Sequence, residues 1–285
     1  MAIPERPVPE KFSGEGISSG AAAQAPAFDA AAADFMALAP RLWEPLGREL
    51  VERSAPHPGE RVLDACCGAG ASALPTARAV GTAGRVDAVD VSGALLAGGE
   101  RSARDLPQLR FAQRDVTTWR PADGPYDLVQ AAYGVFFLPD MDTGSRHLVS
   151  LLRHGGRFAV QTWRHGALAD FARCMLAAVA DEVPPPKERP ASAVASERID
   201  SVPKLAQWLS SLGLTEVRGW EVPYVQPLTP ELAWGLVCGT GWRHLLTGCD
   251  EAAAQRIRDS LLARIERSGL TELDAGSLTG IGIRA

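Results

Sequence analysis

The 285-residue sequence contains no apolar run that approaches the roughly 20 residues needed to cross a bilayer as a helix. Residues 1–20 also lack the charged-then-apolar order of a secretory signal. Lysine is scarce, occurring only at Lys11, Lys187 and Lys204, and the sequence has no basic stripe of the kind that nucleic-acid-binding proteins normally carry. With a net charge of −5, these absences predict a protein that binds neither membranes nor nucleic acid.

The cysteines exclude a further kind of site. None of their spacings is typical of a zinc site, and no base flanks one of them, so we expect small buried hydrophobic side chains and no metal. Free thiols are typical of a reducing compartment and predict a cytoplasmic protein. The excess of arginine over lysine and the abundance of alanine are typical of GC-rich bacterial genomes. The cysteines are Cys66, Cys67, Cys174, Cys238 and Cys249.

The overall composition indicates one globular domain. The contents of 46% hydrophobic and 22% charged residues are ordinary for a soluble chain, and the length allows an α/β domain with an added lobe. Residues 1–26 are rich in proline, glycine, serine and alanine and are predicted to be a mobile arm. Residues 27–285 are predicted to form the folded domain.

The most informative segment reads Arg-Val-Leu-Asp-Ala-Cys-Cys-Gly-Ala-Gly at residues 61–70. A short apolar strand leads into a glycine turn, and a helix is predicted directly after it over residues 71–80. Because glycine lets the backbone approach a ligand closely, this arrangement is typical of a nucleoside-binding corner. Gly68, Gly70 and Ala73 fit the loose Gly-x-Gly-x-x-Gly/Ala spacing, which a tight turn without a ligand also satisfies.

Two acids indicate which nucleoside is bound. Asp64 ends the first strand, where a dinucleotide would place its pyrophosphate. A carboxylate there repels phosphate and favours a cationic group, such as the ammonium or sulfonium of S-adenosylmethionine (SAM). Asp90 ends a second predicted strand, residues 85–90, about twenty residues past the glycines, where NAD and SAM enzymes alike bind a ribose diol. Asp90 therefore indicates an adenosine ribose without choosing between the two cofactors.

Further strands are predicted along the chain. Residues 109–116 contain Asp115 at the expected strand end, residues 126–134 form a fourth strand, and residues 157–163 form a fifth. Strands that alternate with helices predict a doubly wound α/β sheet with its ligand at the carboxyl edge. In the second half we expect helices at 168–180, 202–212 and 251–268, a loop at 183–195, and strands at 214–222 and 273–284.

With these residues the chain resembles the class I SAM-dependent methyltransferases, especially the small-molecule branch of quinone-ring and natural-product enzymes. The resemblance covers roughly residues 28–164. It implies a Rossmann-like seven-stranded sheet whose last strand is antiparallel, with a helical cap at 27–56, a SAM-binding core at 57–165 and a lid-like helical insertion at 229–249. Cys66 departs from the commonest form of the family, which has glycine at that position.

The resemblance also implies individual cofactor contacts. Asp115 would hydrogen-bond the adenine amino group, and the backbone amide of Val116 would contact a ring nitrogen. Residues 131–133, after the fourth strand, would face the methionine end and the methyl group. The expected cofactor-binding residues are Asp64, Ala65, Cys66, Gly68, Gly70, Asp90, Val91, Asp115, Val116, Ala131 and Ala132.

Methyl transfer needs little acid–base chemistry, because positioning supplies most of the rate. A base is required only if the acceptor arrives protonated. The candidates are His165, just beyond the fifth strand, and His244 in the insertion, although isolated histidines are more often structural. Tyr133 is a candidate to orient the acceptor. Trp242 in the insertion suits either a mobile aromatic lid or packing against the sheet.

We therefore expect transfer of a methyl group from SAM to a small aromatic or lipophilic acceptor, a secondary metabolite, with the methylated atom left open. The Asn/Asp-Pro-Pro-aromatic run of enzymes that methylate bases or glutamine is absent after the fourth strand. One alternative is an NAD(P)-dependent oxidoreductase, although no lysine lies near a plausible Tyr-Lys site. Another is a SAM-binding protein without turnover. The oligomeric state is not predicted.

Overall fold

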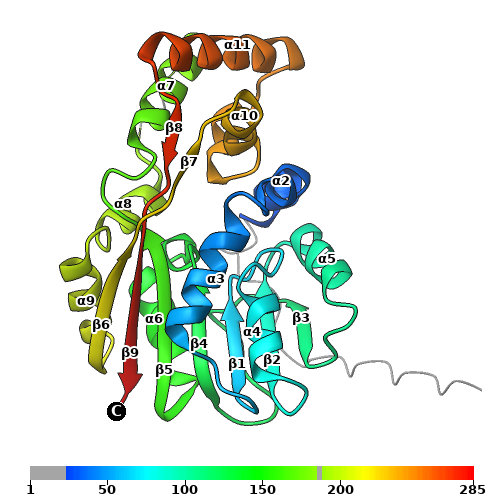
Figure 1. Cartoon of the computed structure of the whole chain (residues 1–285), viewed down its shortest axis with the longest axis vertical. Coiled ribbons are helices and arrows are strands. Elements are labelled where there is room, and N and C mark those ends of the chain that lie inside the picture. The colour runs from blue at the N-terminus through cyan, green and yellow to red at the C-terminus, as the bar shows by residue number, and fades with distance from the viewer. Residues whose placement is uncertain (1–23, 185–187) are drawn as a thin grey trace, which may run out of the picture.

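The computed structural model describes residues 24–184 and 188–285. Most of the predicted mobile arm lies outside the described residues, but Ala25 and Pro26 already belong to the first described helix, α2 (Ala25–Leu38). The centre of the molecule is a seven-stranded sheet in the order β3-β2-β1-β4-β5-β9-β6 (Figure 1). Strand β9 is antiparallel to both of its neighbours, whereas β1 to β5 pair in parallel. The predicted doubly wound sheet with an antiparallel last strand is therefore confirmed.

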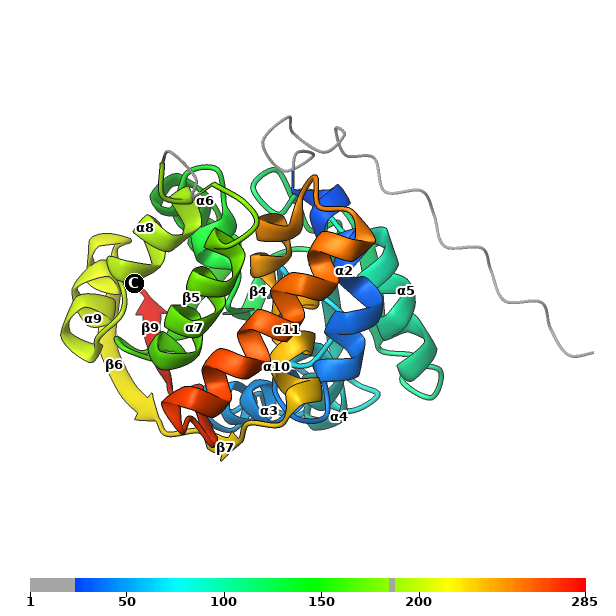
Figure 2. The ribbon, with the colours of Figure 1, turned by 90° about the horizontal axis from the view of Figure 1, so that it is seen from above.

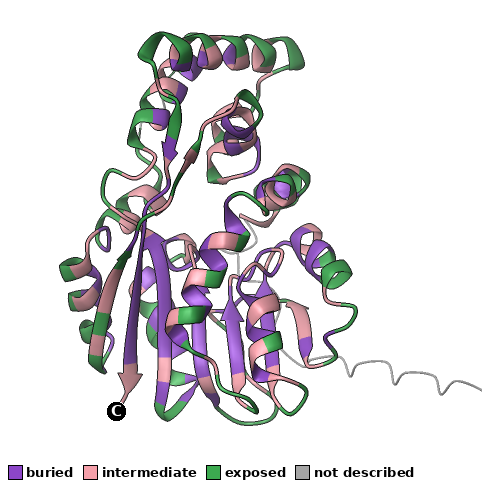
Figure 3. Cartoon of the chain, viewed as in Figure 1, coloured by how far each residue is buried: buried purple, intermediate pink, exposed green. Residues whose placement is uncertain are grey.

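The central strands are buried on both faces, as expected for parallel strands covered by helices on either side (Figure 3). Because both faces of these strands are covered, their sequences are nearly continuous runs of valine, leucine and alanine. The strands of the sheet are β1 (Arg61–Ala65), β2 (Arg85–Asp90), β3 (Leu109–Gln113), β4 (Tyr126–Ala132), β5 (Leu152–Trp163), β6 (Leu214–Val222) and β9 (Ser277–Arg284).

Helices cover both faces of the sheet. Ala159 of β5 packs in a cluster with Leu50 of α3, whereas the neighbouring Phe158 packs with Leu148 of α6 and Leu205 of α9. Because side chains alternate along a strand, α3 and α6 lie on opposite faces. The helices between the strands are α3 (Trp43–Ser54), α4 (Ala73–Val80), α5 (Gly93–Ser102), η1 (Val135–Phe137), α6 (Met141–Ser150), α8 (Ala191–Glu197) and α9 (Val202–Ser211).

A helical roof lies above the carboxyl ends of the parallel strands (Figures 1 and 2). It consists of α2 together with α7 (Ala169–Ala180), α10 (Pro230–Cys238), η2 (Gly241–Leu246) and α11 (Glu251–Ser268). These helices share one apolar cluster, which includes Leu38, Phe171, Leu236 and Leu261. Thr229 and Asp250 cap α10 and α11 with their side chains.

The structure corrects several expected boundaries. The predicted final strand is split into β8 (Glu272–Asp274), which pairs with β7 (Val225–Pro227), and β9, which joins the main sheet. The insertion is therefore wider than 229–249: it spans residues 223–276 and includes α11. The predicted loop at 183–195 contains the start of α8. Within the predicted cap at 27–56, α3 contacts β4 and β5, while its first residues, Trp43 and Leu46, join the apolar cluster of the roof.

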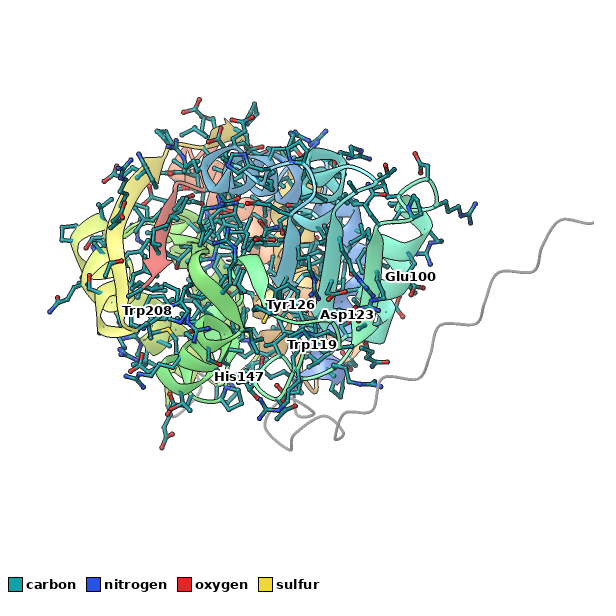
Figure 4. All side chains as sticks on the ribbon, turned by 90° about the horizontal axis from the view of Figure 1, so that it is seen from below. Glu100, Trp119, Asp123, Tyr126, His147 and Trp208 are labelled. Carbon is teal, nitrogen blue, oxygen red and sulfur yellow. The ribbon has the colours of Figure 1, made fainter. Side chains whose placement is uncertain are left out.

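The amino edge of the sheet is held by buried polar contacts (Figure 4). The indole of Trp119 donates to the hydroxyl of Tyr126 over 2.9 Å, and that hydroxyl donates to Asp87 over 2.7 Å. His147 of α6 hydrogen-bonds the carbonyl oxygen of Trp119. These bonds tie β2, β4 and α6 together at the end of the sheet opposite the roof.

Candidate active site

A cavity of about 610 Å³ lies between the carboxyl edge of the sheet and the helical roof. At one end it is lined by the loops that follow β1, β2 and β3, and at the other by aromatic side chains and the loop after β5. The sequence-predicted residues that line it are Cys66, Gly68, Asp90, Val91, Asp115, Val116, Ala132, Tyr133, His165 and His244. Most of the predicted site is therefore brought together in one space.

The loop after β1 has the sharp backbone turn that its glycines predict. Cys66, Gly68 and Gly70 all have positive φ, at 56°, 54° and 88°. The left-handed conformation of Cys66 is one that glycine adopts more easily, which is consistent with the glycine that the family commonly has there. The amide of Gly68 donates to Asp90 over 2.9 Å and fixes the loop against β2.

Asp90 is suited to bind hydroxyl groups. Its carboxylate is only 8% exposed and accepts hydrogen bonds from the backbone amides of Gly68 and Ser92, each over 2.9 Å. Burial raises its pKa, against the lowering effect of these amides. Each carboxylate oxygen can accept a second hydrogen bond, so capacity remains for a ribose diol.

Asp115 lies beyond the end of β3, which stops at Gln113. Its carboxylate accepts hydrogen bonds from the amide and the hydroxyl of Thr117, over 2.8 Å and 2.7 Å. Val116 is buried beside it. Of the described residues, none at this end of the cavity is a lysine or arginine that would bind a pyrophosphate. The buried acceptors therefore fit an adenosine without phosphates, as in SAM.

Four predicted cofactor residues do not line the cavity, namely Asp64, Ala65, Gly70 and Ala131. Asp64 is fully buried and accepts a 2.8 Å hydrogen bond from the side-chain amide of Gln130. The expected direct contact between Asp64 and a cationic ligand is therefore not formed by this geometry. Asp64 lies beneath the loop and ties β1 to β4. Gly70 faces the ring of Phe111 instead.

The acceptor end has an aromatic wall. The ring centroids of Tyr133 and Trp163 are 4.3 Å apart. The ring centroid of Trp43 lies 5.9 Å from that of Tyr133 and 6.3 Å from that of Trp163. Phe35 of α2 stacks on Trp43 at 4.8 Å. Trp242 also lines the cavity and stacks on Phe171 of the roof.

Tyr133 is part of this wall and is not placed for acid–base chemistry. Its hydroxyl forms a 2.5 Å hydrogen bond with Ser277, and burial holds its pKa far above the usual value. The backbone of Tyr133 has a positive φ, and the residue lines the cavity. In this geometry Tyr133 presents its ring to the cavity while its hydroxyl is engaged with Ser277.

The two predicted histidines both line the cavity, one after β5 and the other in η2. Nδ1 of His244 is 2.6 Å from the carbonyl oxygen of Gly241 within the same short helix. Nδ1 of His165 is 2.8 Å from Oδ2 of Asp200, which also lines the cavity. Sequence reasoning missed Asp200, because it lies 35 residues along the chain and no motif marks it.

Residues 24–184 and 188–285 contain neither a membrane-spanning helix nor a cluster of metal-ligating side chains. No helix there is long and apolar enough to span a membrane. No group of three or more histidine, cysteine, aspartate or glutamate side chains among them is arranged to hold a metal ion.

Comparison with known proteins shows which families the chain is similar to. The methyltransferase domain family matches residues 62–156. The chain is 31% identical over 224 residues to trans-aconitate 2-methyltransferase of Klebsiella pneumoniae, covering 76% of this chain and 79% of that protein. It is 36% identical to aklanonic acid methyltransferase of Streptomyces sp. (strain C5) over 47% of this chain, and 37% identical to 2-phytyl-1,4-naphtoquinone methyltransferase of Synechococcus elongatus over 42%. These last two matches span 61% and 52% of the relatives.

Solved structures show the same fold at low identity. The [4+2]-cyclase SpnF has a TM-score of 0.59 and 16% identity over 96% of this chain and all of its own. The YcgJ protein of Bacillus subtilis has a TM-score of 0.56 and 15% identity over 84% of this chain and 98% of its own. The fold and the adenosine-type corner define the class I methyltransferase architecture.

The chain belongs to the SAM-dependent methyltransferases, because one relative is 31% identical over most of both chains. This membership contradicts the alternative of an NAD(P)-dependent oxidoreductase. The cofactor of the family is SAM.

Proposed function

We propose that this protein transfers the methyl group of SAM to a small, largely apolar aromatic acceptor with a secondary-metabolite framework. The observation that carries the proposal is that one cavity joins two buried carboxylates, Asp90 and Asp115, to the aromatic wall of Trp43, Tyr133 and Trp163. A cofactor and an acceptor can therefore lie side by side away from bulk water.

The cofactor end would hold SAM through a few groups. Asp90 would accept hydrogen bonds from the ribose hydroxyls, and Asp115 from the adenine amino group. The turn at Cys66 and Gly68, together with Ala132, would lie against the methionine portion. When bound, SAM supplies an electrophilic methyl group on a positively charged sulfur. The protein aligns the acceptor with that methyl group.

The lining of the acceptor end favours an uncharged, flat molecule. Among the described residues that line the cavity, one is an arginine, Arg164. Its guanidinium is paired with Asp274 over 2.5 Å. The carboxylates of Glu197 and Asp200 line the same end and are paired with Arg189 and Lys204, so the described lining leaves no unpaired lysine or arginine for a polycarboxylate. A flat aromatic ring fits the wall of Trp43, Tyr133 and Trp163 better than the trans-aconitate named for the Klebsiella relative.

The fold alone does not establish methyl transfer, since a protein described as a cyclase shares it. The first test is a calorimetric titration with S-adenosylhomocysteine (SAH), with NADPH as the control ligand. We expect micromolar binding of SAH and none of NADPH. Absence of SAH binding would overturn the proposal.

The second test is a transfer assay with SAM labelled on its methyl group. The acceptors are 1-naphthol, 1-naphthylamine, the hydroquinone 1,4-dihydroxynaphthalene and trans-aconitate, each with and without enzyme. Label is expected in an aromatic acceptor and not in trans-aconitate. SAH binding combined with label in trans-aconitate alone would overturn the acceptor class and leave the cofactor assignment in place.

A further inference from the structure

We infer that His165 and Asp200 form a dyad that accepts the proton of a phenolic or enolic hydroxyl, so that the acceptor is methylated on oxygen. His165 is the catalytic base, and Asp200 is a positioning residue that acts through it. The inference rests on the proposed function and names the reacting group that the proposed function leaves open.

Two hydrogen bonds hold His165 in place against the segment before α9. Its backbone amide donates to the carbonyl oxygen of Asp200 over 2.7 Å, and Nδ1 of its ring lies 2.8 Å from Oδ2 of the same residue. Main chain and side chain are therefore anchored to one partner. This arrangement leaves the other ring nitrogen, Nε2, as the group available to a molecule in the cavity.

The charge on Asp200 determines which ring nitrogen carries the proton. Burial alone would raise the pKa of Asp200, but hydrogen bonds from Lys204 and His165 lower it below its usual value. An ionised carboxylate only accepts hydrogen bonds, so Nδ1 of His165 must be the donor. In the neutral imidazole Nε2 then has a free lone pair and is a base.

Within the part of the chain that the structure describes, the charged groups next to His165 are already paired. Lys204 donates to Oδ1 of Asp200 over 2.7 Å, so Asp200 has a permanent counter-ion and does not require a protonated imidazole. Arg164 donates to the carbonyl oxygen of His165 and pairs with Asp274. The remaining pair near this edge is Glu197 with Arg189.

His165 also has a route for its proton. Its side chain is 83% exposed, whereas that of Asp200 is 11% exposed. A proton taken from an acceptor can therefore leave to solvent, while the partner that orients the ring stays buried. An enclosed histidine would hold the proton and block the next turnover.

The reaction balances as follows. The hydroxyl proton of the acceptor passes to Nε2 of His165 as an oxygen lone pair forms a bond to the methyl carbon. The carbon–sulfur bond breaks, and its electron pair remains on sulfur, which becomes a neutral thioether. The products are a methyl ether, SAH and an imidazolium that returns its proton to water. An aromatic amine has a free lone pair at neutral pH and needs no such base.

The first experiment measures the imidazole tautomer and needs no bound cofactor. In ¹⁵N-labelled protein, long-range ¹H–¹⁵N correlations are assigned to His165 by their loss in His165→Gln. We expect the neutral ring to be protonated on Nδ1 in the wild type, and this preference to be reduced in Asp200→Asn. Asp170→Asn, which alters an exposed carboxylate paired with Arg173, is the matched control and should leave the signal unchanged. A wild-type ring protonated on Nε2 overturns the inference.

The second experiment compares pH profiles with 1-naphthol as acceptor. His165→Gln should lower kcat by about 100-fold or more near neutral pH, as expected for loss of a general base, with SAH affinity unchanged. The deficit should shrink as the pH approaches the pKa of the naphthol itself, because a phenolate needs no base. A deficit that is the same at every pH, or methylation of 1-naphthylamine or a ring carbon in place of the hydroxyl, overturns the inference. Failure of SAH to bind the wild type would instead overturn the proposed function.

Discussion

The carboxylate of Asp64 on β1 and the side-chain amide of Gln130 on β4 are joined by a 2.8 Å hydrogen bond beneath the cofactor loop. Gln130 also donates to the hydroxyl of Thr76 on α4 over 2.9 Å. Burial raises the pKa of Asp64 to about 6, from a usual value of 3.8, although hydrogen bonds from Ser72 and Gln130 oppose the shift. The loop after β1 therefore rests on a carboxyl group whose charge changes under mildly acidic conditions.

This raised pKa predicts a specific dependence of stability on pH. Below pH 3.8 Asp64 is protonated in both the folded and the unfolded protein. Between pH 3.8 and about 6 Asp64 loses its proton in the unfolded chain and keeps it in the folded protein, so the free energy of unfolding falls as the pH rises. Above the folded pKa the full cost is reached, about 3 kcal/mol. Asp64→Asn should remove this slope, so that its stability relative to the wild type rises over this range.

The measurement is urea unfolding at a series of pH values from about 4 to 7. Asp105→Asn, at an exposed carboxylate, is the control and should differ from the wild type by the same amount throughout. A stability difference between Asp64→Asn and the wild type that does not change with pH would mean that Asp64 titrates normally.

Substitution of Asp90 tests the ribose site. Asp90→Ala should weaken SAH binding by about 2 kcal/mol, roughly 30-fold in Kd, because hydrogen bonds to a buried charged group are lost. Calorimetry measures the affinity, and circular dichroism checks that the variant is folded, since Asp90 also accepts from the amide of Gly68. Asp105→Ala serves as the control. Unchanged affinity in folded Asp90→Ala would remove Asp90 from the cofactor site.

Substitution of Trp163 tests the acceptor wall. Trp163→Leu removes the ring that packs at a tilt against Tyr133, and should raise the KM for an aromatic acceptor about tenfold with little change in SAH affinity. Trp220→Leu is the control, because Trp220 lies on β6 against Arg53, outside the cavity lining. Equal effects of the two substitutions would contradict a binding role for the wall.

A substitution at Gly47 tests the contact between α3 and the cofactor loop. A Cβ at this position would lie 2.5 Å from the carbonyl oxygen of Ala71, a backbone atom that cannot move freely. Gly47→Ala should destabilise the protein by about 1–3 kcal/mol through overpacking, in spite of the better helix propensity of alanine. Urea unfolding measures the change, with Glu52→Ala on the exposed face of α3 as the control. A stabilised Gly47→Ala protein would show that the loop yields without cost.

Local patterns were sufficient to predict much of the scaffold. The strands β2 and β6 and the helix α11 have the predicted bounds, because each has a clear apolar pattern between turn or cap residues. The split between β8 and β9 was not predictable in this way. It depends on pairing with β7, a three-residue strand that local sequence hardly distinguishes from a loop.

The site residues also divide into those that local sequence predicts and those that depend on the tertiary structure. Asp90, Asp115 and Val116 follow their strands and reach the cavity, as the order of strand ends predicted. Asp64 does not, because its side chain is fully buried beneath the loop after β1, where it accepts a hydrogen bond from Gln130. Asp200 becomes visible only in three dimensions, where the end of β5 meets the segment before α9.

Val222 and Ser277 are paired neighbours on β6 and β9, and the whole segment between them leaves and re-enters the sheet at this one point. Residues 223–276 thus form a contiguous cassette attached at two adjacent positions, so its length and sequence can change without shifting the register of any strand. The domain family match at 62–156 ends well before the cassette begins. Exchange of this single segment would therefore replace the part of the cavity lining that carries Trp242 and His244, and would leave the aromatic wall of Trp43, Tyr133 and Trp163 in place.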